Sequence, residues 1–558
     1  METFATIGPQ INPTALYFEA IFLFFLVIYA ALRWLKYYGV PENFPPGPPC
    51  VPFLGVLPFI KGDFKAALQE WRETYGDIVG IKLGNELAVV LSDYKVIAAA
   101  FNDDRCAGRP KNLRKIMHAF FASQHSEQTF LKRKSEEEQP TFTSSGIVFA
   151  HGPDWVEQRR FSLRTLRDRG FGKSAMEHAV LEEVKKLTDL IDKKLENNKG
   201  ETSSLDLSKD FSISVVNSLW SILTGEKIAL GDKRVSEIIV GTGKFIRRES
   251  MMGAIMIYPW LRHLPFFNSQ FSHSKNVGPL KMRQMQDEMV AMKQKRRESR
   301  KETLEERKVD YFDGDGLQND FIDEYLSKVD SCRNRKSSFF GGKGVFNLQR
   351  TLSDLFGAGS ETTADMMLFA FLYMIKHPDI QNKVHEEIDK ICGARTVRLA
   401  DKPLMSYVEA TIMEILRHTC LVYTVPHSTT DDLEIDGYAL PKETAIYANM
   451  WHVMRDPDYW EDPDTFRPER FLDEFGNYKS DDRNIPFMIG KRVCIGQSVA
   501  KNSLFLFFTS ILQRYELKAP NGPDSIKTDP IVGFIHYCPS YNVEISHRPN
   551  AMDLIAEE

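Results

Sequence analysis

One segment near the N-terminus is hydrophobic almost throughout: ALYFEAIFLFFLVIYAAL (15–32), where Glu19 is the only charged residue. Asn12 and Pro13, directly before it, are typical of the N-cap and first turn of a helix. A helix from Pro13 to Leu35 would be about 34 Å long, and the hydrocarbon layer of a membrane is about 30 Å thick. The pattern therefore predicts a membrane-spanning helix.

The charges around this segment predict its orientation. Residues 1–14 contain Glu2 but no lysine or arginine, whereas Arg33 and Lys36 follow the apolar run. A cleaved signal peptide would begin with basic residues, so an uncleaved anchor is favoured over a signal peptide or a buried helix. By the positive-inside rule, the C-terminal body should face the cytosol.

Beyond the anchor, the pattern changes to a proline-rich stretch, then to short strands, then to helices. FPPGPPCVPFLG (44–55) contains five prolines and predicts a stiff, extended connection. Alternating apolar residues interrupted at Gly84-Asn85 predict a hairpin. Helical spacing dominates from about 155 to 374, and short strands return at 433–447.

This order predicts a mainly α fold with small β-sheets. The chain shows no internal repeat and no Gly/Ser linker within the body. We therefore expect three parts: a membrane anchor (1–36), a proline-rich hinge (37–55) and one large domain (56–558). Two polar stretches, 123–140 and 331–344, are expected to be surface loops.

Composition narrows the class of protein without choosing a function. The 558 residues carry a formal charge of −5, and 26% are charged, which excludes a basic nucleic-acid binder and a disordered acidic chain. The seven cysteines include no CxxC pair, which argues against a disulfide scaffold or a structural zinc site. Reduced cysteines fit a cytosolic body.

One cysteine, Cys494, lies in a loop that favours a thiolate: FMIGKRVCIG (487–496). Two cations and two glycines surround it: Lys491, Arg492, Gly490 and Gly496. A helix predicted to begin just after the sulfur would direct its N-terminal N–H groups towards an anion there. The alternative is an ordinary buried thiol in a turn. Cys392, in ICGAR, lacks the phenylalanine, the upstream glycine and the following helix.

A second unusual segment is the apolar helix predicted over Gly357–Ile375, because Glu361, Thr362 and Thr363 lie in its middle. Polar groups in a buried helix cost free energy unless they are satisfied or used. A threonine hydroxyl can bond to the preceding turn and loosen the helix there. Ala358-Gly359 would leave room for a small ligand, although a simple kink is the alternative.

Two further helices carry charged or aromatic residues at helical spacing. Glu414 and Arg417 are three residues apart, a spacing that is also common in surface ion pairs. Trp155 and Arg159 lie one turn apart and point the same way, as they also would on an amphipathic surface helix. The same helix carries a basic stripe formed by Arg160, Arg164 and Arg167.

The full loop pattern, Phe487-x-x-Gly490-x-Arg492-x-Cys494-x-Gly496, resembles the haem-binding loop of the cytochrome P450 family. The resemblance implies that Cys494 is the thiolate ligand of the iron of haem b. It also implies that Arg492 pairs with a haem propionate and that Phe487 packs beside the ring. Gln497 departs from the family pattern, in which glutamate is commoner.

The same resemblance gives the other segments roles. Thr362 would hold and protonate dioxygen, with Glu361 on the proton path. Further propionate contacts would come from Trp155, Arg159, His427 and Arg109. Glu414, Arg417 and Arg470 would form a buried structural triad, and apolar pocket residues would be Ala358, Gly359, Val425 and Ile535.

The resemblance extends from the anchor to residue 515 and is greatest to the microsomal subgroup that oxidises steroids, fatty acids and xenobiotics. It implies an endoplasmic reticulum monooxygenase that receives NADPH electrons from a flavoprotein, NADPH-cytochrome P450 reductase, which would dock on the basic stripe. Cytochrome b5 is a further candidate partner. The apolar stretch 251–267 would dip into membrane lipid and guide lipophilic substrates inward, and no nucleic-acid partner is expected.

Two alternatives remain: a haem-thiolate isomerase or dehydratase of peroxides, and a haem-binding protein without turnover. The polar residues between Arg109 and Gly146 depart from the subgroup pattern in one wall of the pocket, so the substrate cannot be inferred from the resemblance.

Overall fold

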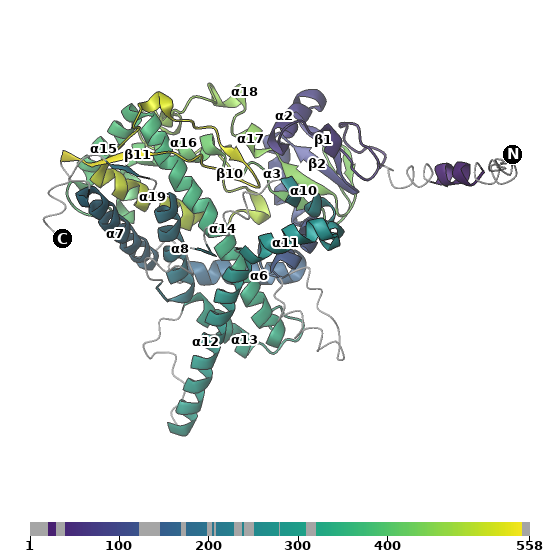
Figure 1. Ribbon diagram of the computed structural model, residues 1–558, viewed down its shortest axis with the longest axis horizontal. Helices are drawn as coiled ribbons and strands as arrows, with labels where there is room; N and C mark the ends of the chain where they lie inside the picture. The colour runs from purple at the N-terminus through teal and green to yellow at the C-terminus, as the bar shows by residue number, and fades with distance from the viewer. Residues whose placement is uncertain are drawn as a thin grey trace, which may run out of the picture.

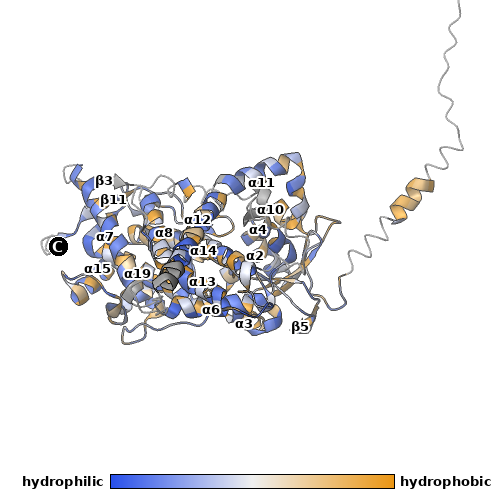
Figure 2. Ribbon diagram, turned by 90° about the horizontal axis from the view of Figure 1, so that it is seen from below, coloured by the Kyte–Doolittle hydropathy of each residue, from blue (hydrophilic) through white to orange (hydrophobic). Residues whose placement is uncertain are grey.

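The computed structural model describes residues 21–29, 40–121, 145–168, 174–197, 203–205, 208–227, 237–238, 250–277, 279–307 and 320–549. Of the predicted membrane span, only 21–29 are among them; they form a helix, coloured as hydrophobic in Figure 2, with exposed apolar side chains such as Phe22 and Phe25. Within the described ranges, no helix combines the length and apolar character that crossing a bilayer requires. The rest of the predicted span lies outside these ranges.

The body is mainly helical, as the residue pattern predicts (Figure 1). Its helices are α2 (Phe64–Tyr75), α3 (Tyr94–Asn102), α4 (Lys111–Phe121), α6 (Gly152–Asp168), α7 (Ser174–Asn197), α8 (Ser208–Thr224), α10 (Ser250–Ile257), α11 (Pro265–Val277), α12 (Pro279–Arg307), α13 (Phe321–Ser331), α14 (Gly341–Lys376), α15 (Pro378–Cys392), α16 (Ser406–Thr419), α17 (Met450–Val453), α18 (Pro457–Trp460) and α19 (Gln497–Arg514). Short 3₁₀ turns include η4 (Pro259–His263), η6 (Pro468–Phe471) and η7 (Gly490–Arg492).

The strands form small sheets, which also agrees with the predicted fold class. One sheet has the order β1 (Ile78–Leu83), β2 (Glu86–Leu91), β7 (Ala445–Ala448) and β4 (Pro426–Ser428). A second has the order β3 (Ser203–Leu205), β11 (Val543–His547) and β8 (Tyr515–Lys518), and two-stranded pairs are β5 (Leu433–Ile435) with β6 (Tyr438–Leu440) and β9 (Ile531–Val532) with β10 (His536–Tyr537).

The hairpin predicted at Gly84-Asn85 is confirmed, since β1 and β2 pair antiparallel with Leu83 opposite Glu86. Strand β2 then pairs in parallel with β7, which is more than 350 residues away in the chain. This pairing joins the N-terminal sheet to the segment that carries His427, because β4 pairs with the other edge of β7.

The proline-rich connection packs on the N-terminal sheet. The Gly80 N–H of β1 donates to the Pro46 carbonyl at 2.8 Å, and the Val56 N–H donates to the Lys82 carbonyl at 2.9 Å. Residues 45–56 therefore occupy part of the open edge of β1, an edge that would otherwise present unpaired backbone groups. The segment predicted as a spacer is, from residue 45 onward, part of the body.

Helix α14 forms the centre of the core and crosses the body in Figure 1, in contact with α8, α12, α13, α16 and α19. From Ala364 to Ile375 every residue is buried. Burying one large apolar side chain stabilises the fold by about 1.5–3 kcal/mol, so this stretch contributes strongly to the core.

The predicted surface loop at 331–344 is partly wrong. Helix α14 already begins at Gly341, and Phe339 is 1% exposed in an aromatic cluster. Glu157 of α6 accepts hydrogen bonds from Ser337 and Ser338, which holds the connection against the body. Polar composition suggested solvent exposure, which holds for most of 331–336, but these tertiary contacts bury residues 337–339. The other expected loop, 123–140, lies outside the described residues.

Candidate active site

The loop around Cys494 packs against the end of α3. The Cys494 N–H donates to the Phe487 carbonyl at 3.0 Å, which closes the loop. Gly490 has φ +75°, and a Cβ atom there would lie 2.0 Å from the backbone oxygen of Phe101. Because both the backbone conformation and the space exclude a side chain, only glycine fits this position.

The Cys494 side chain is exposed, although burial is the main cause that raises the pKa of its thiol. A thiol with both properties faces a space enclosed by protein rather than bulk water. The backbone of Gly496, at the start of α19, and the charge of Arg159 both lower the pKa of the thiol. The helix predicted after the sulfur is confirmed as α19, and these groups would favour a thiolate.

Arg492 is buried and bonded to the backbone of two distant segments. Its guanidinium donates to the carbonyls of Ala107 at 2.9 Å and Ile147 at 3.2 Å, and also to that of Ala150. It lies 3.6 Å from the ring centroid of Trp155 on α6. Arg492 thus connects the cysteine loop to the two chain segments on either side of α4.

Two more arginines lie in the same region. Arg109 donates to the carbonyls of Val148 at 2.9 Å and Pro426 at 3.0 Å, and Arg159 donates to the Val493 carbonyl. Through these bonds, side chains from the segment just before α4, from α6 and from the cysteine loop converge. The sequence pattern predicted this grouping by resemblance only, since the acceptors are backbone atoms.

The arginine group carries an uncompensated positive charge. Burial, together with the charges of Arg109 and Arg159, lowers the pKa of Arg492 to about 7, and burial lowers that of Arg109 to about 10. In the described part of the chain, no carboxylate forms an ion pair with any of these three guanidinium groups. The lowered pKa values express the cost of burying three cations together, and a bound anion would offset that cost.

Two buried side chains beside the arginines have polar atoms that make no hydrogen bond of good geometry: Trp155 Nε1 and both ring nitrogens of His427. His427 stacks on Phe101 at 4.1 Å, and burial, followed by the charges of Arg109 and Arg492, keeps its pKa well below the ordinary value. Buried polar atoms are normally satisfied. An unsatisfied Trp155 N–H and three guanidinium groups without a carboxylate counter-ion fit the two carboxylates of a propionate-bearing haem.

Within the buried helix α14, one stretch is accessible. Ala358 is exposed, and Gly357, Gly359 and residues 361–363 are half-buried, although residues on both sides are buried. The Thr362 hydroxyl donates to the Ala358 carbonyl at 2.6 Å. The back-bond is therefore present as predicted, but α14 continues through it without a break.

The predicted pocket residues differ in accessibility. Val425 is half-buried, and a Cβ at Gly359 would lie 2.8 Å from Leu219 of α8. Ile535 is 5% exposed in the core, whereas its neighbour Phe534, at the turn between β9 and β10, is 47% exposed. The pocket position predicted at Ile535 is therefore a core position, and the accessible apolar side chain of this turn is its neighbour Phe534.

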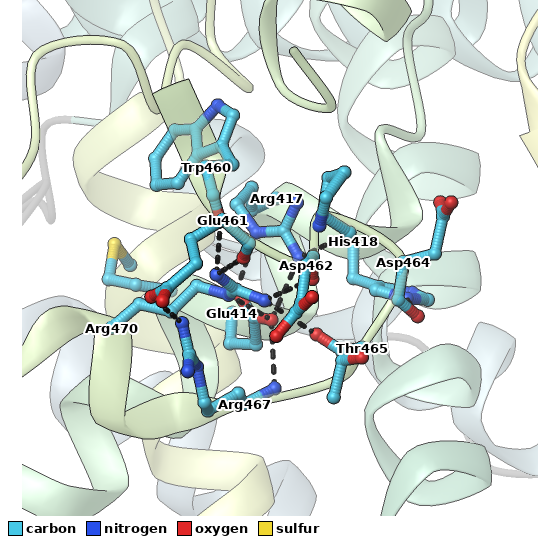
Figure 3. A network of polar contacts seen from close by, with 12 residues as sticks. Glu414, Arg417, His418, Trp460, Glu461, Asp462, Asp464, Thr465, Arg467 and Arg470 are labelled. Carbon is cyan, nitrogen blue, oxygen red and sulfur yellow. Dashed lines mark hydrogen bonds and ion pairs between the residues drawn. The ribbon is translucent and has the colours of Figure 1, made fainter. Parts of the chain in front are cut away.

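Glu414, Arg417 and Arg470 form a buried network (Figure 3). Arg417 donates to Glu414 through Nε at 2.7 Å and Nη2 at 2.8 Å, and Arg470 Nε donates to the same carboxylate at 3.2 Å. The remaining Arg470 donors bind backbone carbonyls between Trp460 and Thr465. These are the contacts that the resemblance implies, and they fix the segment that precedes the cysteine loop.

Two surface features were also predicted. Arg160, Arg164 and Arg167 of α6 are exposed, and the last two lie near Asp168 at 3.8 Å and 3.3 Å. In the stretch 251–267, the exposed large apolar side chains among those that the structure describes are Trp260, Leu264 and Phe266.

Comparison with known proteins agrees with this geometry. The family model described as Cytochrome P450 matches residues 45–543. The chain is 32% identical over 501 residues to human "Cytochrome P450 2U1", covering 88% of this chain and 83% of that protein. It is 31% identical over 540 residues to "Cytochrome P450 2B2" of Rattus norvegicus, covering 95% and 100%, and 31% identical over 528 residues to "Cytochrome P450 2J1" of Oryctolagus cuniculus, covering 93% of each. The chain belongs to the cytochrome P450 family of haem-containing monooxygenases.

Proposed function

We propose that this protein is a membrane-anchored P450 that uses NADPH electrons, delivered by a flavoprotein reductase, to insert one oxygen atom into a lipophilic substrate. The observation that carries the proposal is the cationic cradle of Arg492, Arg109 and Arg159 beside an accessible cysteine. When bound, haem b supplies the activation of dioxygen, of which one atom enters the product and the other leaves as water.

Several residues of the chain would together bind that cofactor. Cys494 would provide the thiolate ligand, and Phe487 would pack beside the ring. The carboxylates would bind to the three arginines, and Trp155 Nε1 and the His427 ring would add hydrogen bonds to them. Because backbone carbonyls already hold Arg109, Arg159 and Arg492 in position, the cradle would be preformed for the cofactor.

Thr362 and Glu361 are proposed to handle protons. The Thr362 hydroxyl proton is engaged by the Ala358 carbonyl, so the hydroxyl oxygen remains available to accept a hydrogen bond from a protonated ligand or from water. Glu361, next to it on the accessible stretch of α14, would supply a carboxyl group that exchanges protons with solvent.

The apolar surfaces support a lipophilic substrate and attachment to the endoplasmic reticulum membrane. A Cβ on Gly84, at the β1–β2 turn, would lie within 3 Å of Ile257 and Tyr258, so the stretch 251–267 adjoins the N-terminal sheet. Phe53, in the proline-rich connection that packs on this sheet, and Trp260, in the stretch 251–267, are both exposed and present apolar side chains on neighbouring parts of the body. Lipophilic molecules dissolved in the bilayer would enter from this side.

The exposed arginines of α6 are the proposed docking surface for the acidic reductase and for cytochrome b5. Arg159 on the same helix lies close enough to Cys494 to lower the pKa of its thiol, so a bound donor would be near the ligand side of the haem. Electrostatic docking of this kind weakens with ionic strength.

A reconstituted assay tests the proposal. Purified protein, reductase, NADPH and a panel of steroids, terpenoids and fatty acids should give a product carrying one oxygen atom from labelled O₂. Turnover of a peroxide without reductase would instead favour the isomerase, which the retained Glu361-Thr362 pair disfavours. Haem binding without any turnover would favour a carrier.

A further inference from the structure

Asp354 is a buried carboxylate on α14 that has no part in the proposed chemistry. It is 4% exposed, and its Oδ2 atom accepts two backbone hydrogen bonds, from Ile147 at 2.6 Å and from Val148 at 2.9 Å. On α14 it precedes Ala358 by four residues and Thr362 by eight, so it lies near the same face of the helix. The Asp354 carboxylate thus holds a segment of backbone, around Ile147 and Val148, against the helix that carries the accessible stretch.

The first residue of this segment, Gly146, has a backbone conformation that fits Asp354. Gly146 has φ +82°, and a Cβ atom there would lie 2.4 Å from Asp354 Oδ2. Its N–H donates to Asn347 Oδ1 of α14 at 3.2 Å. Since the backbone approaches the carboxylate too closely for any side chain, the contact depends on glycine at this position.

The carbonyl groups of the same segment bind the arginines that lie beside the cysteine loop. Arg492 donates to the carbonyls of Ile147 and Ala150, and Arg109 donates to that of Val148. The backbone of residues 146–150, which we call the bridging segment, therefore binds α14 through its N–H groups and the cationic cradle through its carbonyls. In both Ile147 and Val148, the N–H is bound by Asp354 and the carbonyl is bound by an arginine of the cradle.

Neighbouring positive charges and backbone N–H groups stabilise the ionised carboxylate of Asp354. Burial raises the pKa of Asp354, while Arg350 and the two backbone N–H groups lower it. Arg283 of α12, whose guanidinium is bound to Asp287 at 2.7 Å and Gln349 at 3.0 Å, also lowers it. Because a buried carboxylate without such partners would be costly, its presence here indicates a specific structural requirement.

We propose that Asp354 is a positioning residue: through the bridging segment it sets the position of Arg492 and Arg109, and so couples the substrate-side helix α14 to the haem-propionate cradle. This inference rests on the proposed function for its haem part, but the coupling is a property of the polypeptide. A change at Asp354 should therefore be detected at the cysteine loop, which it does not touch.

Hydrogen exchange of the full-length protein, carried out with and without haem, measures the coupling directly. Asp354→Ala leaves two buried N–H groups without an acceptor, so exchange of Ile147 and Val148 should accelerate about tenfold or more. Exchange in residues 490–494 should accelerate as well, since Arg492 loses fixed acceptors. Asp354→Asn should show smaller effects, because an amide oxygen can still accept both hydrogen bonds.

A matched control is Asp365→Ala, which removes another buried carboxylate of α14, one that accepts from the Cys538 N–H at 3.3 Å. It should destabilise the protein without accelerating exchange in residues 146–150 or 490–494. Gly146→Ala should reproduce the Asp354→Ala signature, and the double variant should be less than additive because both remove one contact. Additive effects, or equal effects in the Asp365 control, would overturn the proposal.

The haem readout separates the two proposals. In the loaded protein, Asp354→Ala should speed transfer of haem to an acceptor protein about tenfold and shift the haem reduction potential, whereas Asp365→Ala should leave both unchanged. Normal haem retention with accelerated exchange would overturn the link to the cradle while leaving the P450 assignment intact. A wild-type chain that binds no haem would refute the proposed function, and the exchange data would then still decide whether Asp354 is coupled to the cysteine loop.

Discussion

The Glu414 network allows a quantitative test of what holds the segment before the cysteine loop. Glu414 is fully buried and accepts from Arg417 and Arg470, and also from the Arg467 N–H at 2.9 Å. In Glu414→Gln the amide oxygen can keep the three bonds made by Oε1. The amide nitrogen would then face Arg417 Nε, which now donates to Oε2 at 2.7 Å. The variant loses the charge that neutralises two arginines and places two donors against each other.

Removing one partner of a buried ion pair costs about 3–5 kcal/mol, much of it from the charge left unpaired. The matched control is Glu469→Gln, which removes a surface ion pair with Lys383 at 2.9 Å, where the two side chains are 43% and 51% exposed. Exposed pairs contribute about 0–1 kcal/mol. Urea unfolding of the haem-loaded protein should therefore show a difference of about 3 kcal/mol between the two variants. Equal free energies of unfolding would refute the role given to the buried network.

Three further predictions concern the loop, the proton path and the response to acid. Gly490→Ala should lower haem content and destabilise the protein by more than the cost of a positive φ, which is about 1–2 kcal/mol. Gly476→Ala, where φ is +80° but no atom lies within 4 Å of the added Cβ, should cost no more than that. Equal losses of stability would contradict the packing of Gly490 against Phe101. Thr362→Ala should lower product formation about tenfold or more while NADPH consumption continues and peroxide is released; tight coupling would argue against the relay. Burial lowers the pKa of His385 to about 4, below its unfolded value of about 6.5, so the free energy of unfolding should fall as pH drops from 6.5 to 4. His385→Gln should therefore reduce the number of protons taken up on unfolding at pH 5 by about one. An unchanged dependence of stability on pH in this variant would contradict the prediction.

Local patterns predicted the elements whose signals are contained in a few neighbouring residues. The β1–β2 hairpin follows from alternation around Gly84-Asn85, and α19 follows from the apolar run after the cysteine. Helix α14 was predicted only from Gly357. Its first sixteen residues begin with glycines and polar side chains that have low helix propensity, and burial against neighbouring helices overrides that preference.

Long-range contacts explain what the sequence did not reveal. The partners of Asp354 lie 206 and 207 residues away, and they are backbone N–H groups with no side-chain signature. The same holds for the carbonyls that bind Arg492. Arg492 and Cys494 could be recognised as part of a sequence motif, but the backbone carbonyls that accept from Arg492 depend on how distant segments pack.

The most direct test of the central claim is the absorption spectrum of the reduced carbon-monoxide complex. Wild-type protein should show the spectrum typical of a thiolate-ligated haem, and Cys392→Ser, which changes a buried cysteine elsewhere, should keep it. Cys494→Ser should abolish that spectrum, even if some haem is retained by the arginine cradle. An unchanged thiolate spectrum in Cys494→Ser would contradict the assignment of this cysteine as the ligand.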